Sequence, residues 1–191
     1  MTEPQYRFLK ITALAMALAW VGWSVYDFLR AKQPGDYAYH AASNYFADGY
    51  YEQALEEYRK ALAIAPDHRA AQRGLAETLI LLGQERESIA LYDTLIGDDP
   101  DNPGLYANRG IAHDRLGQHE QALADYRKAL SIDPEQIEGP GWLTRFFRNQ
   151  YEKPPGIAQR ADYLEHQLAL PPDERVLRVP EIDRAQRPFK G

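Results

Sequence analysis

The sequence repeats itself every 34 residues between positions 35 and 136. Nine residues of three types carry this period: Gly49, Gly83 and Gly117; Tyr58, Tyr92 and Tyr126; Pro66, Pro100 and Pro134. A strict period of this length is typical of stacked helix-turn-helix units, because one pair of helices cannot bury its own apolar side chains. The repeat therefore predicts an all-α solenoid of three units, with bounds at 35–68, 69–102 and 103–136.

The third unit shows the pattern most clearly. Gly117 predicts the turn between two helices, since glycine readily adopts the left-handed conformation that ends a helix. Ala122, Tyr126 and Ala129 then follow at helical spacing and form one apolar stripe. Pro134 ends the second helix. Small residues at Gly110 and Ala122 indicate a close approach of the two helices.

Two segments resemble the second helix of the tetratricopeptide repeat (TPR) family. They are YYEQALEEYRKALAIAP, which begins at Tyr50, and HEQALADYRKALSIDP, which begins at His119. The middle unit departs from the family pattern at Ser88 and Leu95, where alanine is usual. The resemblance covers about half of the chain, and it implies a protein-binding solenoid rather than an enzyme.

In the resembled family the first helix of each unit lines a binding groove. That resemblance implies a protein-binding groove formed by Tyr39, Ser43, Phe46, Arg73, Glu77, Ile80, Ile111, Asp114 and Arg115, with Asp36, Ala47, Ala70, Leu81, Gly104 and Ala107 at the remaining positions. Some of these side chains have packing between repeats as an alternative role, namely Phe46, Ile80, Leu81 and Ile111. Tyr39 and Ser43 do not fit the lysine and asparagine clamp of the chaperone-binding members, so a chaperone-tail receptor is not predicted.

Charge and composition exclude several classes of function. The formal net charge of −6 argues against a nucleic-acid surface. The chain has no cysteine, which removes disulfides and thiol catalysis. Its five histidines lack metal-site spacing, and no phosphate-binding loop or nucleophile motif is present. We therefore expect no catalytic residue, no metal, no cofactor and no small-molecule substrate.

The segment from Phe8 to Leu29 is rich in apolar residues and predicts a single transmembrane anchor within residues 1–31. Trp20, Trp23 and Tyr26 lie near one end of it, as interfacial aromatic residues do. A cleaved signal peptide and a buried helix that caps the solenoid are the alternatives. By analogy with single-pass bacterial TPR proteins, the interpretation places the repeats in a periplasm.

The C-terminal third lacks the period. Residues 137–170 predict capping helices, with one apolar face at Trp142, Leu143, Phe146 and Phe147 and another at Ile157, Ala161, Leu164 and Leu168. Residues 171–191 carry four prolines and predict an extended tail. We expect this tail to dock on a neighbouring subunit or on its own repeats through Val176, Leu177, Val179, Ile182 and Phe189.

Together these features predict a non-enzymatic, membrane-anchored TPR scaffold. It would bind other proteins, as subunits of a membrane-bound complex that it assembles or stabilises. The alternative is a transient assembly factor, or an adaptor or chaperone that meets client proteins.

Overall fold

The structure is a computed structural model that describes residues 3–30, 34–134, 137, 156–179 and 188. Its described residues form helices and contain no strand. The helices are α1 (Glu3–Arg30), α2 (Asp36–Ala47), α3 (Tyr51–Ile64), α4 (Arg69–Leu81), α5 (Glu85–Asp98), α6 (Pro103–Arg115), α7 (His119–Ile132) and α10 (Ile157–Ala169), followed by a short 3-10 turn, η1 (Pro172–Glu174).

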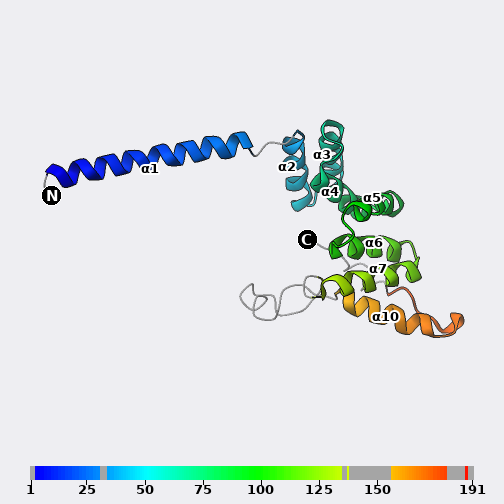
Figure 1. Ribbon diagram of the computed structural model, residues 1–191. Coiled ribbons are helices and arrows are strands. Elements are labelled where there is room, and N and C mark those ends of the chain that lie inside the picture. The colour runs from blue at the N-terminus through cyan, green and yellow to red at the C-terminus, as the bar shows by residue number, and fades with distance from the viewer. Residues whose placement is uncertain (1–2, 31–33, 135–136, 138–155, 180–187, 189–191) are drawn as a thin grey trace.

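Six of the helices form the three predicted pairs (Figure 1). α2 packs on α3, α4 on α5 and α6 on α7, and each pair also contacts the next. The first helices additionally touch one another, α2 against α4 and α4 against α6. They therefore follow one side of the stack, and the predicted all-α helical solenoid is confirmed.

The turns within the pairs follow from the periodic glycines. Gly49, Gly83 and Gly117 have φ values of 83°, 74° and 76°. At Gly83 the backbone N–H donates to the carbonyl of Ile80, and the next N–H, of Gln84, donates to Leu79. These two bonds satisfy carbonyls that the end of α4 would otherwise leave open. The same pattern recurs at the other two glycines, so each pair turns at the same geometry.

Close contacts between helices depend on residues without a bulky side chain. A Cβ atom added at Gly110 would lie 2.7 Å from the Tyr126 ring, and one at Gly74 would lie 2.3 Å from the Tyr58 ring. The middle unit has Ser88 where the family pattern has alanine, and this serine makes a polar contact between helices. There the hydroxyl of Ser88 donates to the carbonyl of Ala76 at 2.8 Å.

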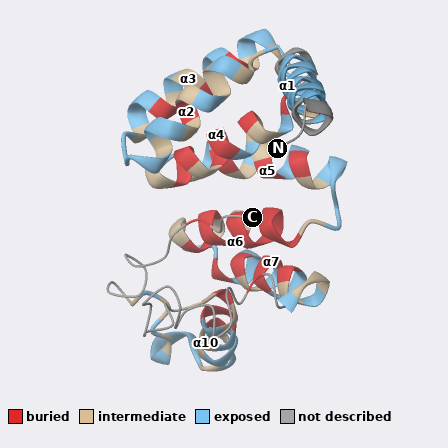
Figure 2. Ribbon diagram, turned by 90° about the vertical axis from the view of Figure 1, so that its left-hand side faces the viewer, coloured by how far each residue is buried: buried red, intermediate tan, exposed pale blue. Residues whose placement is uncertain are grey.

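The buried residues form two core clusters that meet at α4. The small cluster joins α2, α3 and α4 around Tyr58, Leu75 and Leu79. The large cluster runs from α4 to α10 around Tyr92, Tyr126 and neighbouring apolar side chains. Figure 2 shows the result, with α6 the most continuously buried helix. The third repeat thus contributes more buried residues to the core than the first does.

One guanidinium connects three helices of the second and third repeats. Arg109 of α6 donates to both carboxylate oxygens of Asp125 in α7, at 2.8 and 2.6 Å. Its remaining nitrogen donates to Asp93 of α5 at 2.7 Å. These hydrogen bonds, first of all those with Asp125, raise the pKa of Arg109 above its ordinary value. The arginine therefore remains charged and fixes the angle between the two repeats.

The prediction of a transmembrane anchor is wrong. α1 is a helix of 28 residues that extends away from the repeats (Figure 1). Among the described residues, however, no helix combines the length and the apolar character that a membrane crossing requires. Lys10, Thr12, Gly22 and Ser24 interrupt the apolar residues of α1. These side chains contribute little hydropathy, so the predicted single-pass membrane localisation is withdrawn with the anchor.

The C-terminal region contributes one described capping helix. α10 packs against α7 and buries Ile157, Ala161 and Leu164 in the large core, while Leu168 stays half-buried. The first predicted capping face, from Trp142 to Phe147, lies outside the described residues. Within residues 156–179, the predicted helix is therefore present and is followed by an extended segment.

Candidate functional site

The first helices of the three repeats enclose a pocket of about 270 Å³, which we call the groove. α2 contributes an aromatic wall, α4 a charged wall and α6 an amide and a leucine. The larger lining side chains are Tyr39, Ser43, Phe46, Arg73, Glu77, Asn102, Leu105 and Asn108, with Tyr58 and Tyr92 from the second helices. The pocket thus combines apolar surface with a few polar groups, as a site for a protein segment does.

Tyr58 and Ser43 form a polar contact in the first repeat. Ser43 Oγ donates to the carbonyl of Tyr39 at 3.0 Å and lies 3.3 Å from the hydroxyl of Tyr58. Since the serine hydrogen is used, the tyrosine hydroxyl donates to Ser43 Oγ. Burial raises the pKa of Tyr58, an effect that the contact with Ser43 opposes and the charge of Glu77 reinforces. The hydroxyl therefore acts as a neutral donor.

Tyr92 supplies the equivalent hydroxyl from the second repeat. Its side chain is fully buried, and this burial raises the pKa of the phenol well above its ordinary value. The negative charge of Glu77 acts in the same direction, whereas Asn108 and Arg73 lower that pKa. Arg73 is exposed and Glu77 lies one turn further along α4. The groove therefore presents one cation and one anion close together.

A histidine fixes the start of α4 beside the groove. His68 Nδ1 accepts a hydrogen bond from the backbone N–H of Ala71 at 3.2 Å. This acceptor role places the proton on Nε2, which lies 3.0 Å from Asp36 Oδ1 and donates to it. The imidazole also packs against Tyr39, with 4.9 Å between the ring centres. His68 and Asp36 thus position the first two repeats relative to each other.

The structure brings together five of the nine predicted groove residues, all of them from the first two repeats. Tyr39, Ser43, Phe46, Arg73 and Glu77 all line the pocket and are at least partly accessible. Ala47, Ala70 and Gly104 line it as well. Their role in binding a partner stays a prediction.

The remaining predicted groove residues lie elsewhere. Ile80 and Ile111 are 0% and 1% exposed and belong to the large core, which is the packing role that the sequence left open. Asp114 is 5% exposed, and Arg115 donates to the carbonyl of Ile80 at 2.6 Å. These four side chains hold repeats together rather than face the pocket.

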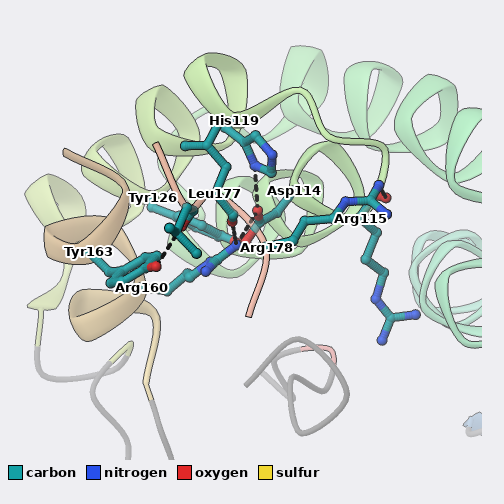
Figure 3. Close-up of polar contacts among 9 residues, drawn as sticks. Asp114, Arg115, His119, Tyr126, Arg160, Tyr163, Leu177 and Arg178 are labelled. Carbon is teal, nitrogen blue, oxygen red and sulfur yellow. Dashed lines mark hydrogen bonds and ion pairs between the residues drawn. The ribbon is translucent and has the colours of Figure 1, made fainter. Parts of the chain in front are cut away.

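Asp114 is covered by a segment far away in the sequence (Figure 3). Arg160 of α10 donates to both of its carboxylate oxygens, at 2.7 and 2.8 Å. His119 Nδ1 lies 3.0 Å from the same carboxylate, and the hydroxyl of Tyr126 donates to it at 3.3 Å. A buried carboxylate with this many partners is satisfied, so Asp114 is not available to a ligand.

The described part of the tail folds back on its own repeats. Leu177 packs against the large core, Val179 is half-buried, and Val176 is 58% exposed. The other two predicted contacts, Ile182 and Phe189, lie outside the described residues.

Several lining residues were absent from the predicted site. Tyr58 and Tyr92 are periodic, and the sequence marks them as packing residues without showing that their hydroxyls reach the groove. Asn102 precedes Pro103 and caps α6 by accepting from the N–H of Gly104 at 3.1 Å. Asn108 follows Tyr92 by 16 residues, as Gly74 follows Tyr58. Comparing these two intervals would have placed Asn108 beside the tyrosine.

Comparison with protein families identifies the repeats. Two models described as tetratricopeptide repeat match this chain, one over residues 45–108 and the other over residues 104–136. Together they span the three pairs of helices from the end of α2 onward.

Curated relatives are similar to part of this chain. The human protein O-mannosyl-transferase TMTC1 is 28% identical over 91 residues, which are 48% of this chain and 10% of that protein. The Hsp70-Hsp90 organizing protein of Triticum aestivum is 28% identical over 89 residues, 47% of this chain and 15% of that protein. The chain therefore spans only a small part of the length of these relatives.

Solved structures share the fold. The first TPR of Spaghetti (RPAP3), bound to the HSP90 peptide SRMEEVD, has a TM-score of 0.58 at 17% identity and covers 72% of this chain and 95% of its own. MamA 41-end from Desulfovibrio magneticus RS-1 has a TM-score of 0.52 at 19% identity, with coverage of 71% and 78%. At this identity the likeness establishes the fold alone.

Proposed function

Because residues 45–136 are tetratricopeptide repeats and form a protein-interaction domain, we propose that this protein is an adaptor that binds an extended segment of a client protein in the groove. The observation that supports the proposal is the pocket itself, which opens between α2, α4 and α6. Tyr39 and Phe46 offer apolar contact to side chains of the segment. Arg73 and Glu77, which are both at least partly accessible, offer polar contact to it.

The charges of the groove favour an internal segment over an acidic chain end. Arg73 is the cation among the residues that line the pocket, and Glu77 follows it by one helical turn. An acidic peptide end would place several negative charges beside Glu77, which is unfavourable because the described lining residues include no second lysine or arginine. The similar solved structure with the bound peptide SRMEEVD therefore informs us about the fold of this chain and not about its ligand.

The adaptor role replaces the scaffold of a membrane complex as the main interpretation. The scaffold interpretation depended on the anchor, which the structure does not support. The similarity to an Hsp70-Hsp90 organizing protein over the repeats agrees with an adaptor that contacts other proteins. We propose only the chemistry of the client, which is an extended segment of mixed or neutral charge with an apolar side chain.

Affinity purification from native extracts tests this function. The full chain is compared with Tyr39→Ala and Arg73→Glu, which alter the groove, and with Arg86→Glu, which makes the same charge reversal on exposed α5. We expect both groove variants to lose the same protein that the unchanged chain and Arg86→Glu recover. Equal recovery by all four proteins would contradict a client site in the groove.

A labelled SRMEEVD peptide tests the chemistry of the ligand separately. Fluorescence anisotropy with the full chain should show no saturable binding, since Arg73 is a single cation among the described residues of the groove and a row of carboxylates needs several. Saturable binding that Arg73→Glu abolishes would instead assign an acidic chain end to the groove.

A further inference from the structure

Residues 175–179, which we call the tail segment, lie in extended form along α10 (Figure 3). Side chains of α10 contact their backbone. The hydroxyl of Tyr163 donates to the carbonyl of Val176 at 2.5 Å, and Arg160 donates to the carbonyl of Leu177 at 3.0 Å. In the other direction the N–H of Val176 donates to Gln167 Oε1 at 2.7 Å. The tail segment is therefore held mainly through groups that every peptide has.

Two side chains of the tail segment add selectivity. Leu177 packs against the large core, beside the carboxylate and guanidinium of Asp114 and Arg160. Arg178 reaches the turn between α6 and α7 and donates to the carbonyl of Arg115 at 3.3 Å. An apolar anchor next to a cation, with backbone bonds on either side, is the arrangement by which proteins bind extended peptides.

The surface beneath the tail segment is anchored without it. α10 buries Ile157, Ala161 and Leu164 in the core, and Arg160 forms its ion pair with Asp114. By contrast, Val176 is 58% exposed and its neighbour Arg178 is exposed too. Removing the tail segment would therefore uncover a formed surface rather than collapse it.

We propose that this face of α10, with the adjoining α6–α7 turn, is a second peptide-binding site that residues 175–179 occupy as an intramolecular ligand. The site recognises an extended segment with a leucine-like residue followed by a cation. While the tail segment is bound, the site is closed to other chains. It is separate from the groove, so it is tested without knowledge of the client.

Binding of a synthetic peptide in trans tests the site. The probe is a fluorescent peptide with the sequence of residues 171–191, and the proteins are full chains. Val176→Pro removes the N–H that Gln167 accepts, whereas Val176→Ala keeps it. Loss of one such bond should weaken the internal tail about threefold to tenfold, and the affinity for the probe should rise by the same factor. Val176→Ala should match the unchanged chain.

One variant that frees the tail segment more completely and two control variants complete the test. Leu177→Asp removes the apolar anchor and should increase probe binding more than Val176→Pro does. Gln167→Ala, added to Leu177→Asp, should lower probe binding about threefold to tenfold, because the probe then loses the acceptor for its own N–H. Arg73→Glu in the groove should leave probe binding unchanged.

Four results would overturn the proposal. Equal affinity of the probe for the unchanged, Val176→Pro and Leu177→Asp chains would show that the internal tail does not compete. A folded Leu177→Asp chain that fails to bind the probe would remove the site. Loss of cooperative melting in both tail variants would make the tail part of the core. Loss of probe binding in Arg73→Glu would transfer it to the groove.

Discussion

Asp114 and Arg160 are separated by 46 residues and form a bidentate ion pair whose side chains are 3% and 5% exposed. The pair fastens α10 to the third repeat at a position predicted from the sequence to line the groove. Removing one partner of such a pair leaves a buried charge without compensation, which usually destabilises more than the intact pair stabilises.

Asp114→Asn should therefore lower the free energy of unfolding by about 3–5 kcal/mol. Urea denaturation of the full chain, followed by circular dichroism, measures the change. Arg59→Ala serves as the control, because it breaks an ion pair with Glu87 in which both side chains are about half exposed. That loss should stay below about 1 kcal/mol. Similar losses in the two variants would contradict the structural role of the buried pair.

The period of the sequence predicted the three helix pairs because each periodic residue has a local cause. Gly83 ends a helix through its own backbone conformation, and the stripe around Tyr126 is visible within one helix. The covering of Asp114 could not be predicted in this way, since Arg160 lies in a region without the period. Exposure of a groove position depends on such contacts: Tyr39, Arg73 and Glu77 line the pocket, whereas Asp114 is buried under Arg160.

The error at the N-terminus has a different physical origin. The prediction rested on the length of the uncharged run and on its aromatic residues, whereas the average hydropathy of α1 is lowered by Lys10, Thr12, Gly22 and Ser24. Length is necessary for a membrane crossing, but it does not supply transfer free energy.

Gly110→Ala should destabilise the third repeat by about 1–3 kcal/mol, because the new Cβ meets the Tyr126 ring at 2.7 Å. Gly97→Ala is the matched control within α5, where a Cβ meets nothing within 4 Å. That change should stabilise the helix by up to about 1 kcal/mol through propensity. Thermal melting of both variants measures the difference. A Gly110→Ala chain as stable as the unchanged protein would contradict the close packing of α6 on α7.

The two buried tyrosines predict a loss of stability at alkaline pH. Burial raises the pKa of Tyr58 and of Tyr92 in the folded state, so the unfolded chain loses these protons first. Stability is then fully present below about pH 10, the ordinary pKa of tyrosine, and falls as the pH rises above it. Tyr92→Phe should make this fall shallower in urea denaturation between about pH 8 and 11.

Tyr37→Phe is the control for the alkaline experiment, because that side chain is 81% exposed. Its stability should decline with pH as steeply as that of the unchanged chain. A Tyr92→Phe chain with an equally steep decline would show that this phenol does not determine the alkaline limit.

Deletion of residues 1–31 should leave the stability of the repeats unchanged within about 0.5 kcal/mol. Neither core cluster of the described residues includes a side chain from α1. The deletion should also reduce self-association, since α1 exposes large apolar side chains such as Trp20 and Trp23, at 67% and 69%. Sedimentation velocity at several concentrations measures the second effect. A lower melting temperature after deletion would show that α1 packs on the repeats.

The division of the core at α4 has a consequence for how the protein opens. In a stack of repeats each unit is stabilised by its own packing and by its neighbour, so cooperativity is local. Leu79 of α4 belongs to the small cluster and the adjacent Ile80 to the large one. The α2–α3 hairpin is thus a foldon with little packing of its own. Its amides should exchange with deuterium through partial opening, while those of α6 and α7 should exchange only through global unfolding.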